Sequence, residues 1–128
     1  LLMYAEAKNE IDGANTTVYN AVDRIRQRAE LETLASLKPG MTKEQMRREI
    51  WLERFREFMY EGILYLDVRR WRVAHTDDPI FGLNHTEVDY RLVTEWYKKV
   101  FRENKDYLWP IPGSEIDINP LMNQNPGW

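Results

Sequence analysis

The stretch from Thr42 to Trp71 carries a ladder of glutamates at four-residue steps, and this ladder constrains what the rest of the chain must supply. Residues four apart lie on the same side of a helix, so each carboxylate faces another like charge, which costs roughly 0.2–0.5 kcal/mol per pair on an exposed helix. Arginines within the helix offset part of this cost, and the remainder requires cations from other segments. The ladder comprises Glu49, Glu53, Glu57 and Glu61, and the candidate cations are Arg24, Arg26, Arg28, Arg69 and Arg70.

The same stretch predicts two helices separated by a glycine. Thr42 is a good cap, and Gln45 three residues later completes a capping-box pattern. Gly62 is expected to end the first helix, and a second short helix would run to Trp71. Steps of three and four residues give the first helix one mainly apolar face, which is expected to consist of Arg47, Trp51, Phe55, Phe58 and Gly62.

Length and composition describe one ordinary globular domain. The chain has 128 residues, 43% of them hydrophobic and 30% charged. A net charge of −3 disfavours a general binder of nucleic acid or anionic membranes, and the absence of cysteine excludes disulfides and thiolate metal sites. No stretch approaches the ~18 apolar residues of a membrane-spanning helix. The first residues are typical of a helix interior, so we expect a fragment whose missing N-terminal part holds further helix pairs and any export signal.

Two helices are predicted before the ladder, over residues 1–12 and about 17–31. Gly13 would end the first, and Thr16 or Thr17 would cap the second. The resulting antiparallel hairpin fits a plain helical bundle as well as a tetratricopeptide-like unit. Residues 34–41 are expected to be a linker and 76–84 a loop, while 88–101 suggest short extended or mixed structure.

The tail after Asp106 is rich in proline and also apolar. Four prolines exclude a long helix there, although Ser114 begins a pattern that permits one short turn. Such a tail is expected to lie as an irregular strap over helices. Polar side chains would hydrogen-bond the backbone groups that the prolines leave unpaired, and the candidates are Asn119, Asn123, Gln124 and Asn125.

Four segments together resemble the C-terminal part of the SusD/RagB family. They are LLMYAEAKNE at 1–10, VDRIRQRAEL at 22–31, IWLERFREFMYEGILYLDVRRW at 50–71 and YLWPIPGSEIDINPLMNQNPGW at 107–128. The last two are the specific ones, and the four occur in the family's order over nearly the whole chain. Three residues depart from the family pattern: Asp23 stands where Asn is usual, Glu30 where Gly is usual, and Leu64 where Arg is common.

The resemblance implies a mainly α protein built on tetratricopeptide-like helix hairpins, with residues 1–128 as its C-terminal SusD/RagB-like domain. It also implies a lipid-anchored outer-membrane protein at the bacterial cell surface, working in nutrient uptake with a SusC-like TonB-dependent transporter. Such a protein binds glycan without catalysis and without a cofactor or metal. Capture of peptide or glycopeptide, as in the RagB branch, is the alternative, and a glycoside hydrolase is disfavoured.

The glutamate ladder has two readings. Paired carboxylates could serve as the acid and base of a glycosidase. We favour a structural ion-pair network, because Arg26 and Arg28 would keep the carboxylates ionised, and we expect Glu53 or Glu57 to contact one of the arginines. The predicted network comprises Arg26, Arg28, Glu53, Arg54, Glu57, Glu61, Asp67 and Arg70.

Glycan binding calls for flat aromatic faces beside amides and carboxylates. The region after Trp71 is least like the family pattern, and its candidates are Phe81, Asn84, Tyr90, Trp96 and Tyr97, with Asp77 and Asp78 as polar partners. Phe81 and Trp96 could instead pack on helices, and the framework tryptophans Trp51, Trp71 and Trp109 are expected in the core. The histidines His75 and His85, with Asp77, Asp78 and Asp89, could hold a metal, but we expect solvated loop residues.

Overall fold

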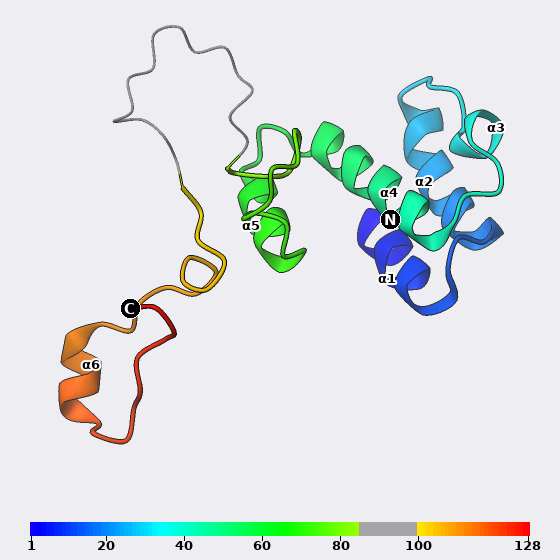
Figure 1. Ribbon diagram of the computed structural model, residues 1–128. Helices are drawn as coiled ribbons and strands as arrows, with labels where there is room; N and C mark the ends of the chain where they lie inside the picture. The colour runs from blue at the N-terminus through cyan, green and yellow to red at the C-terminus, as the bar shows by residue number, and fades with distance from the viewer. Residues whose placement is uncertain (85–99) are drawn as a thin grey trace, which may run out of the picture. The chain divides into compact units, whose positions relative to one another are not determined.

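The computed structural model describes residues 1–84 and 100–128, and every regular element within them is a helix, as predicted (Figure 1). The described chain divides into two compact units, Leu1–Leu64 and Tyr65–Trp128. Among the described residues, no helix combines the length and the apolar character needed to cross a membrane.

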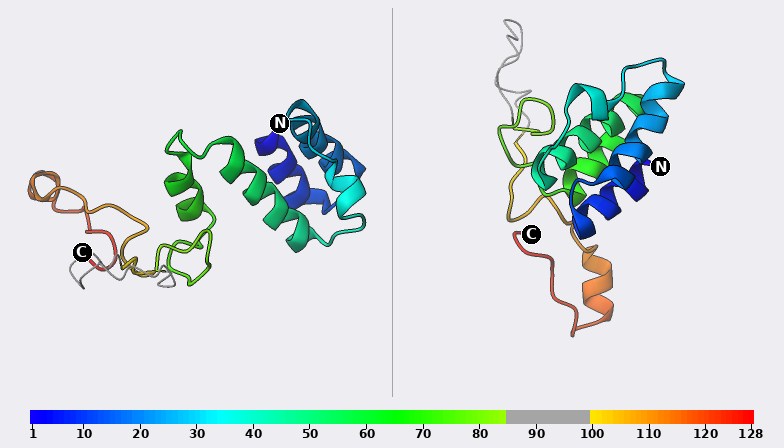
Figure 2. Two further views of the ribbon diagram at one scale, coloured as in Figure 1. Left: turned by 90° about the horizontal axis from the view of Figure 1, so that it is seen from above. Right: turned by 90° about the vertical axis from the view of Figure 1, so that its right-hand side faces the viewer.

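Three helices form the core of the first unit. α1 (Leu2–Asp12) and α2 (Thr16–Arg28) make the predicted hairpin around Gly13, and α1 also packs against α4 (Lys43–Glu57), as the views in Figures 1 and 2 show. The shared core is apolar and consists of Leu2, Ala5, Val18, Ala21, Val22, Leu34, Met46 and Ile50. The hairpin is present, while its tetratricopeptide-like character stays a prediction.

The cap of α2 differs from the prediction. The side chain of Asn15, not of Thr16 or Thr17, accepts hydrogen bonds from the backbone N–H groups of Thr17 and Val18, at 2.9 and 3.2 Å. Asn15 has an extended backbone and its side-chain oxygen reaches the first turn, which is the geometry that a capping residue needs.

The segment predicted as a linker contains a helix of one turn, α3 (Leu34–Leu37). Thr33 caps it by accepting a hydrogen bond from the backbone N–H of Ser36 at 3.3 Å. Leu34 is 1% exposed and packs into the core. A four-residue segment is too short to show a periodic pattern in the sequence, and its helix is stabilised by this tertiary packing.

The capping box of α4 is confirmed: Thr42 N–H donates to Gln45 Oε1 at 2.8 Å, and Gln45 N–H donates to Thr42 Oγ1 at 3.2 Å. The face predicted to be apolar is not the one that is buried most deeply. Arg47, Trp51, Phe55 and Phe58 are partly exposed, whereas the helix buries Met46, Ile50, Glu53 and Arg54. α4 carries both an aromatic and an aliphatic row of side chains. The aliphatic row is the one that fits the surface of the α1–α2 hairpin.

Gly62 was expected to end the first helix, but α4 ends at Glu57, before Gly62. Gly62 has a positive φ of 72° that favours glycine, and it lies in the predicted break between the two helices. α5 (Ile63–Arg70) follows it. The loop after α5 turns tightly at Asp78, whose carboxylate accepts from the N–H groups of Ile80 and Phe81 at 2.9 and 2.8 Å. Among the described residues of the second unit, the buried apolar side chains are those of Val68, Ala74, Phe81, Phe101 and Tyr107.

The tail is irregular, with one short helix, α6 (Gly113–Ile118), at the turn that the sequence permitted. Three of the four predicted polar side chains bond the backbone: Asn119 accepts from Leu121 N–H, Gln124 bonds Ile111, and Asn125 donates to Trp109 O. Within this chain no residue of α6 is buried and most apolar side chains after Tyr107 are exposed, so the packing of the tail over helices stays a prediction.

Candidate functional site

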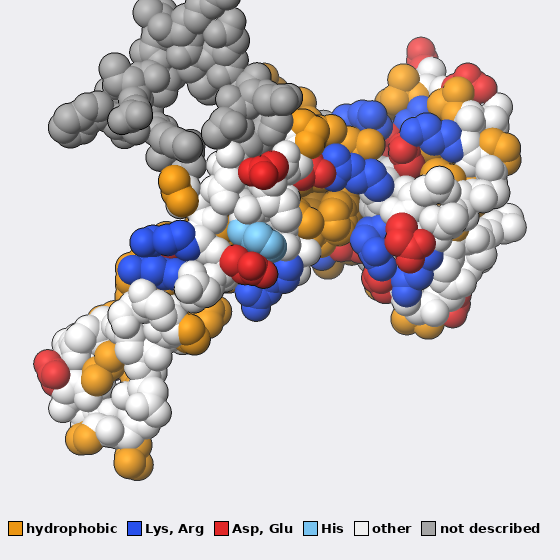
Figure 3. All heavy atoms as spheres, viewed as in Figure 1, with side chains coloured by type: hydrophobic (Ala, Val, Ile, Leu, Met, Phe, Trp, Pro, Cys, Tyr) orange, Lys and Arg blue, Asp and Glu red, His pale blue; other side chains and the backbone are white. Residues whose placement is uncertain are grey.

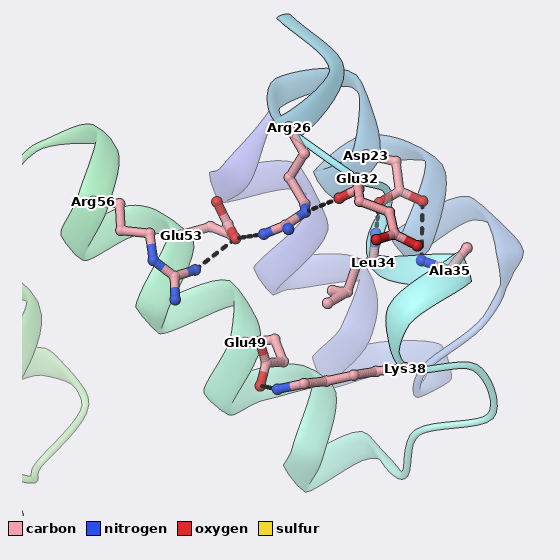
Figure 4. Close-up of polar contacts among 9 residues, drawn as sticks. All are labelled: Asp23, Arg26, Glu32, Leu34, Ala35, Lys38, Glu49, Glu53 and Arg56. Carbon is pink, nitrogen blue, oxygen red and sulfur yellow. Dashed lines mark hydrogen bonds and ion pairs between the residues drawn. The ribbon is translucent and has the colours of Figure 1, made fainter. Parts of the chain in front are cut away.

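Three glutamates of the ladder each have a cation partner from another segment (Figure 4). Arg26 on α2 contacts Glu53, Arg28 contacts Glu57, and Lys38 after α3 contacts Glu49. Each of these cations comes from outside α4, which is what the like-charge spacing required. The ladder therefore fastens α4 to the segment that runs from α2 to the end of α3.

The Arg26–Glu53 pair lies deepest. Glu53 is 2% exposed and Arg26 is 9% exposed. Arg56 also donates to Glu53, at 2.7 Å and from the side opposite Arg26, while the Nε of Arg26 donates to the backbone oxygen of Glu32 at 2.7 Å (Figure 4). Buried charges are tolerated only when they are paired and hydrogen-bonded, and this pair meets both conditions.

Asp23 is buried and binds the start of α3. From the sequence it was noted only as a departure from the family pattern. Its carboxylate accepts from the backbone N–H groups of Leu34 and Ala35 at the start of α3, and the side chain is 6% exposed (Figure 4). Asp23 and Leu34 are eleven residues apart in the sequence, and no local spacing pattern predicts a contact at that separation.

Other members of the predicted network make contacts of their own, and their joining into one network stays a prediction. Arg70 pairs with Asp67 on its own helix at 2.8 Å, and Arg54 lies 4.0 Å from Glu6 and over the ring of Phe58. Glu61 is exposed and makes no ion pair with any residue in the described ranges. It follows Phe58, where the helix has already ended, so it no longer shares the face of the other glutamates.

A further ion-pair cluster joins α1 to α4. Arg47 donates to both carboxylate oxygens of Glu10, at 2.6 and 2.7 Å, and Lys43 lies 3.5 Å from the same carboxylate. The Arg47 hydrogen bonds lower the pKa of Glu10, and the Glu10 hydrogen bonds raise the pKa of Arg47. The contact is bidentate, and such geometry adds both strength and specificity to a pair between arginine and a carboxylate.

The candidate glycan residues that the structure describes are used for packing and loop closure. Phe81 is 1% exposed, and its ring meets Trp71 edge to face at a centroid distance of 5.5 Å, so its flat face is closed to a sugar. Asn84 accepts from Phe101 N–H at 2.6 Å and donates to the backbone oxygens of His75 and Phe101, both at 2.9 Å. Both side chains are thus engaged within the protein, and the ligand-binding role expected for Phe81 and Asn84 stays a prediction. Tyr90, Trp96, Tyr97, His85 and Asp89 lie outside the described residues.

His75 makes contacts within the second unit. Its Nδ1 lies 2.7 Å from the hydroxyl of Tyr107, and its Nε2 lies 3.6 Å from Glu103 Oε1; the pale blue ring is visible beside a red carboxylate in Figure 3. Within the described ranges, no group of three His, Asp or Glu side chains has the arrangement needed to hold a metal ion.

Sequence reasoning missed one exposed aromatic group. The guanidinium of Arg69 lies 5.3 Å from the ring centre of Tyr65 and 5.4 Å from that of Trp109. The same guanidinium donates to Tyr65 OH at 3.0 Å and to the backbone oxygen of Tyr107. Trp109 is 70% exposed, so the expectation that it belongs to the core is wrong, whereas Trp51 and Trp71 are half-buried.

Comparison with known proteins gives one consistent result. A family model described as the SusD family matches residues 1–128. SusD-like protein P2 of Formosa agariphila is 33% identical over 134 residues, which cover 100% of this chain and 24% of that protein.

A solved structure agrees in fold. The crystal structure of a SusD superfamily protein from Parabacteroides distasonis aligns with a TM-score of 0.68 and 31% identity, over 99% of this chain and 25% of that one. This chain thus spans about a quarter of the length of each relative. With a match over every residue, the chain belongs to the SusD family.

Proposed function

We propose that this chain is part of a protein that captures glycan at the bacterial cell surface and passes it to a SusC-like TonB-dependent transporter in the outer membrane. The observation that carries this proposal is family membership over all 128 residues, since the SusD family generally consists of nutrient-binding surface proteins. A lipid anchor outside this chain would hold the protein at the membrane.

The contacts of the ladder favour binding over hydrolysis. A glycosidase needs two carboxylates about 5–10 Å apart that both face the scissile bond. Here Glu49, Glu53 and Glu57 instead face lysine or arginine partners from neighbouring segments. Carboxylates that are engaged in this way hold helices together, which supports a non-catalytic role for this part of the protein.

Glycan contacts of this chain are proposed for Tyr90, Trp96 and Tyr97. Aromatic rings offer the flat apolar faces on which the C–H groups of a pyranose ring stack. Phe81 and Asn84, which lie in the preceding loop, are weaker candidates because their side chains are engaged within the protein. The remaining contacts would come from segments that correspond to the three quarters of the relatives outside this match.

The test uses the complete polypeptide in native gels cast with neutral or acidic polysaccharides. We expect retardation by at least one polysaccharide, with weaker retardation of Trp96→Ala and Tyr97→Ala. Tyr60→Ala is the matched control, because Tyr60 is 98% exposed in the first unit and is not proposed as a contact. Retardation by no polysaccharide, together with calorimetric binding of peptides, would replace glycan by peptide capture, and release of new reducing ends would indicate a hydrolase.

A further inference from the structure

The C-terminal loop, defined as residues 108–128, closes on itself through side-chain hydrogen bonds. Gln124 both accepts from Ile111 N–H at 2.8 Å and donates to Ile111 O at 2.9 Å. Asn125 Nδ2 donates to Trp109 O at 2.6 Å, and Trp128 Nε1 donates to Leu108 O at 3.1 Å. Three successive contacts thus join the two ends of the loop.

The base of the loop is tight. Gly127 has a φ of +83°, and a Cβ there would lie 2.9 Å from Lys105 Cβ and 3.1 Å from Asn104 O. The ammonium of Lys105 lies 3.9 Å from the ring centre of Trp128. Four prolines restrict the backbone between the two ends. Little conformational freedom therefore remains to be lost when the loop binds another surface.

The loop turns its apolar side chains outward. Trp109 is 70% exposed, Ile118 is 78% exposed and Leu121 is 89% exposed, and no residue of α6 is buried. Figure 3 shows hydrophobic side chains, in orange, on the surface around α6. Isolated apolar side chains are common on surfaces, but a preformed loop with several of them marks a contact surface.

The charges of the loop indicate what it contacts. Its only charged side chains are Glu115 and Asp117, and it contains no lysine or arginine. A symmetric contact between two copies would bring like charges together, which disfavours a dimer through this loop. A complementary surface is apolar at its centre with lysine or arginine at its rim.

We propose that the C-terminal loop docks into an apolar groove with a basic rim, formed by the part of the same polypeptide outside residues 1–128. The chain spans about a quarter of the length of its relatives, so the larger part of such a protein is available to form the groove. The loop then acts as a preformed clamp between the end of the polypeptide and its earlier part. This proposal does not depend on the identity of the nutrient.

The first test places a photo-crosslinking amino acid at position 121 in the complete, monomeric polypeptide. Crosslinked peptides are expected to come from outside residues 1–128, and Lys or Arg should occur near the crosslinked residues. Crosslinks only to residues 1–128, only between two copies, or only to a transporter added in membranes would each overturn the proposal.

The second test compares Leu121→Ser with Leu66→Ser in the complete polypeptide. Leu66 is the matched control, because it has the same side chain and is 63% exposed but lies on α5, outside the loop. Leu121→Ser is expected to lower Tm by several degrees and Leu66→Ser by about one degree or less. In the unmutated polypeptide, hydroxyl-radical labelling of Leu121 should be at least about five-fold slower than labelling of Leu66. This measurement does not depend on whether either variant folds. Equal shifts in Tm or equal labelling would contradict docking.

Discussion

Glu53 and Arg26 make the most consequential pair of side chains in the first unit, because both are buried and each satisfies the other. We predict that Glu53→Gln lowers the free energy of unfolding by about 3–5 kcal/mol, since it leaves the Arg26 guanidinium buried without a counter-charge. Chemical denaturation followed by circular dichroism measures this change.

Glu57→Gln is the control for this prediction, because it breaks a pair whose cation, Arg28, is 71% exposed. An exposed pair contributes about 0–1 kcal/mol, so the two variants should differ clearly. The double variant Arg26→Met/Glu53→Met should recover much of the loss, because no charge remains buried. Equal effects of Glu53→Gln and Glu57→Gln on the free energy of unfolding would show that burial of the Arg26–Glu53 pair does not set its contribution to stability.

Asp106 gives a prediction for acid titration. Hydrogen bonds from the Arg102 side chain, at 2.9 and 3.0 Å, and from the Arg102 backbone N–H lower its pKa from 3.8 to about 2. A carboxylate with a lowered pKa stabilises the folded state above its unfolded pKa, and that contribution is lost as the pH falls through the folded pKa. The turn at residues 102–106 should therefore loosen between about pH 4 and pH 2.

Nuclear magnetic resonance of the Asp106 carboxyl carbon measures this pKa directly. In Arg102→Gln the pKa should move back toward its ordinary value, because the charged donor is gone. A midpoint near 4 in the unmutated protein would show that the Arg102 contact is absent in solution.

At the scale of single elements, the start of α2 depends on Asn15. Asn15→Ala should reduce the free energy of unfolding by about 1 kcal/mol, the usual cost of losing a capping side chain. Thr16→Ala and Thr17→Ala should each cost less than half of that, since neither threonine supplies the capping bond. Thermal unfolding of the three variants ranks these effects, and a larger loss for either threonine would contradict the assigned cap.

The loop after α5 depends on Gly82. A Cβ there would lie 2.1 Å from Thr76 O and 2.7 Å from Asp78 N, and these backbone atoms cannot move without opening the turn. Gly82→Ala should therefore destabilise the protein by at least about 3 kcal/mol. Gly113→Ala is the matched control, because its Cβ would meet nothing within 4 Å and its φ is not positive. Denaturant midpoints compare the two, and similar midpoints would be inconsistent with the packing at Gly82.

Local signals in the sequence predicted the helices well. The features that the sequence did not predict depend on contacts between residues that are far apart in the chain. The Thr42–Gln45 box, the hairpin around Gly13 and the break at Gly62 all follow from residues within a few positions of one another. The like charges of the ladder also predicted that cations must come from elsewhere. The most deeply buried face of α4 was not predicted because an aromatic stripe and an aliphatic stripe both fit a helix, and only the surface of α1 and α2 selects between them.

The candidate site was less predictable for the same reason. Aromatic composition identifies residues that can stack on sugars, but it does not separate Phe81, which packs against Trp71, from Trp109, which is exposed. Asn84 is suited to bind a ligand by its chemistry, yet its amide closes a loop onto Phe101, seventeen residues away. Assigning such side chains to packing or to ligand binding requires knowledge of which segments are in contact in the fold.

For the molecule as a whole, the assignment of residues 1–128 to the C-terminal domain of the family stays a prediction, and the chain spans about a quarter of the length of its relatives. We expect the complete polypeptide to co-purify from detergent-solubilised outer membranes with a TonB-dependent transporter. Affinity purification followed by mass spectrometry tests this association, and consistent recovery without any such transporter would argue against delivery to one.

The central claim is that the protein binds glycan and that the α4 carboxylates stabilise the fold instead of performing catalysis. The most direct measurement is calorimetric titration of the complete polypeptide with a polysaccharide that retards it in gels, followed by assay of reducing ends. Unmutated protein and Glu57→Gln are predicted to bind with the same Kd and to release no new reducing ends. Release of reducing ends by the unmutated protein that Glu57→Gln abolishes, with binding unchanged, would contradict the claim.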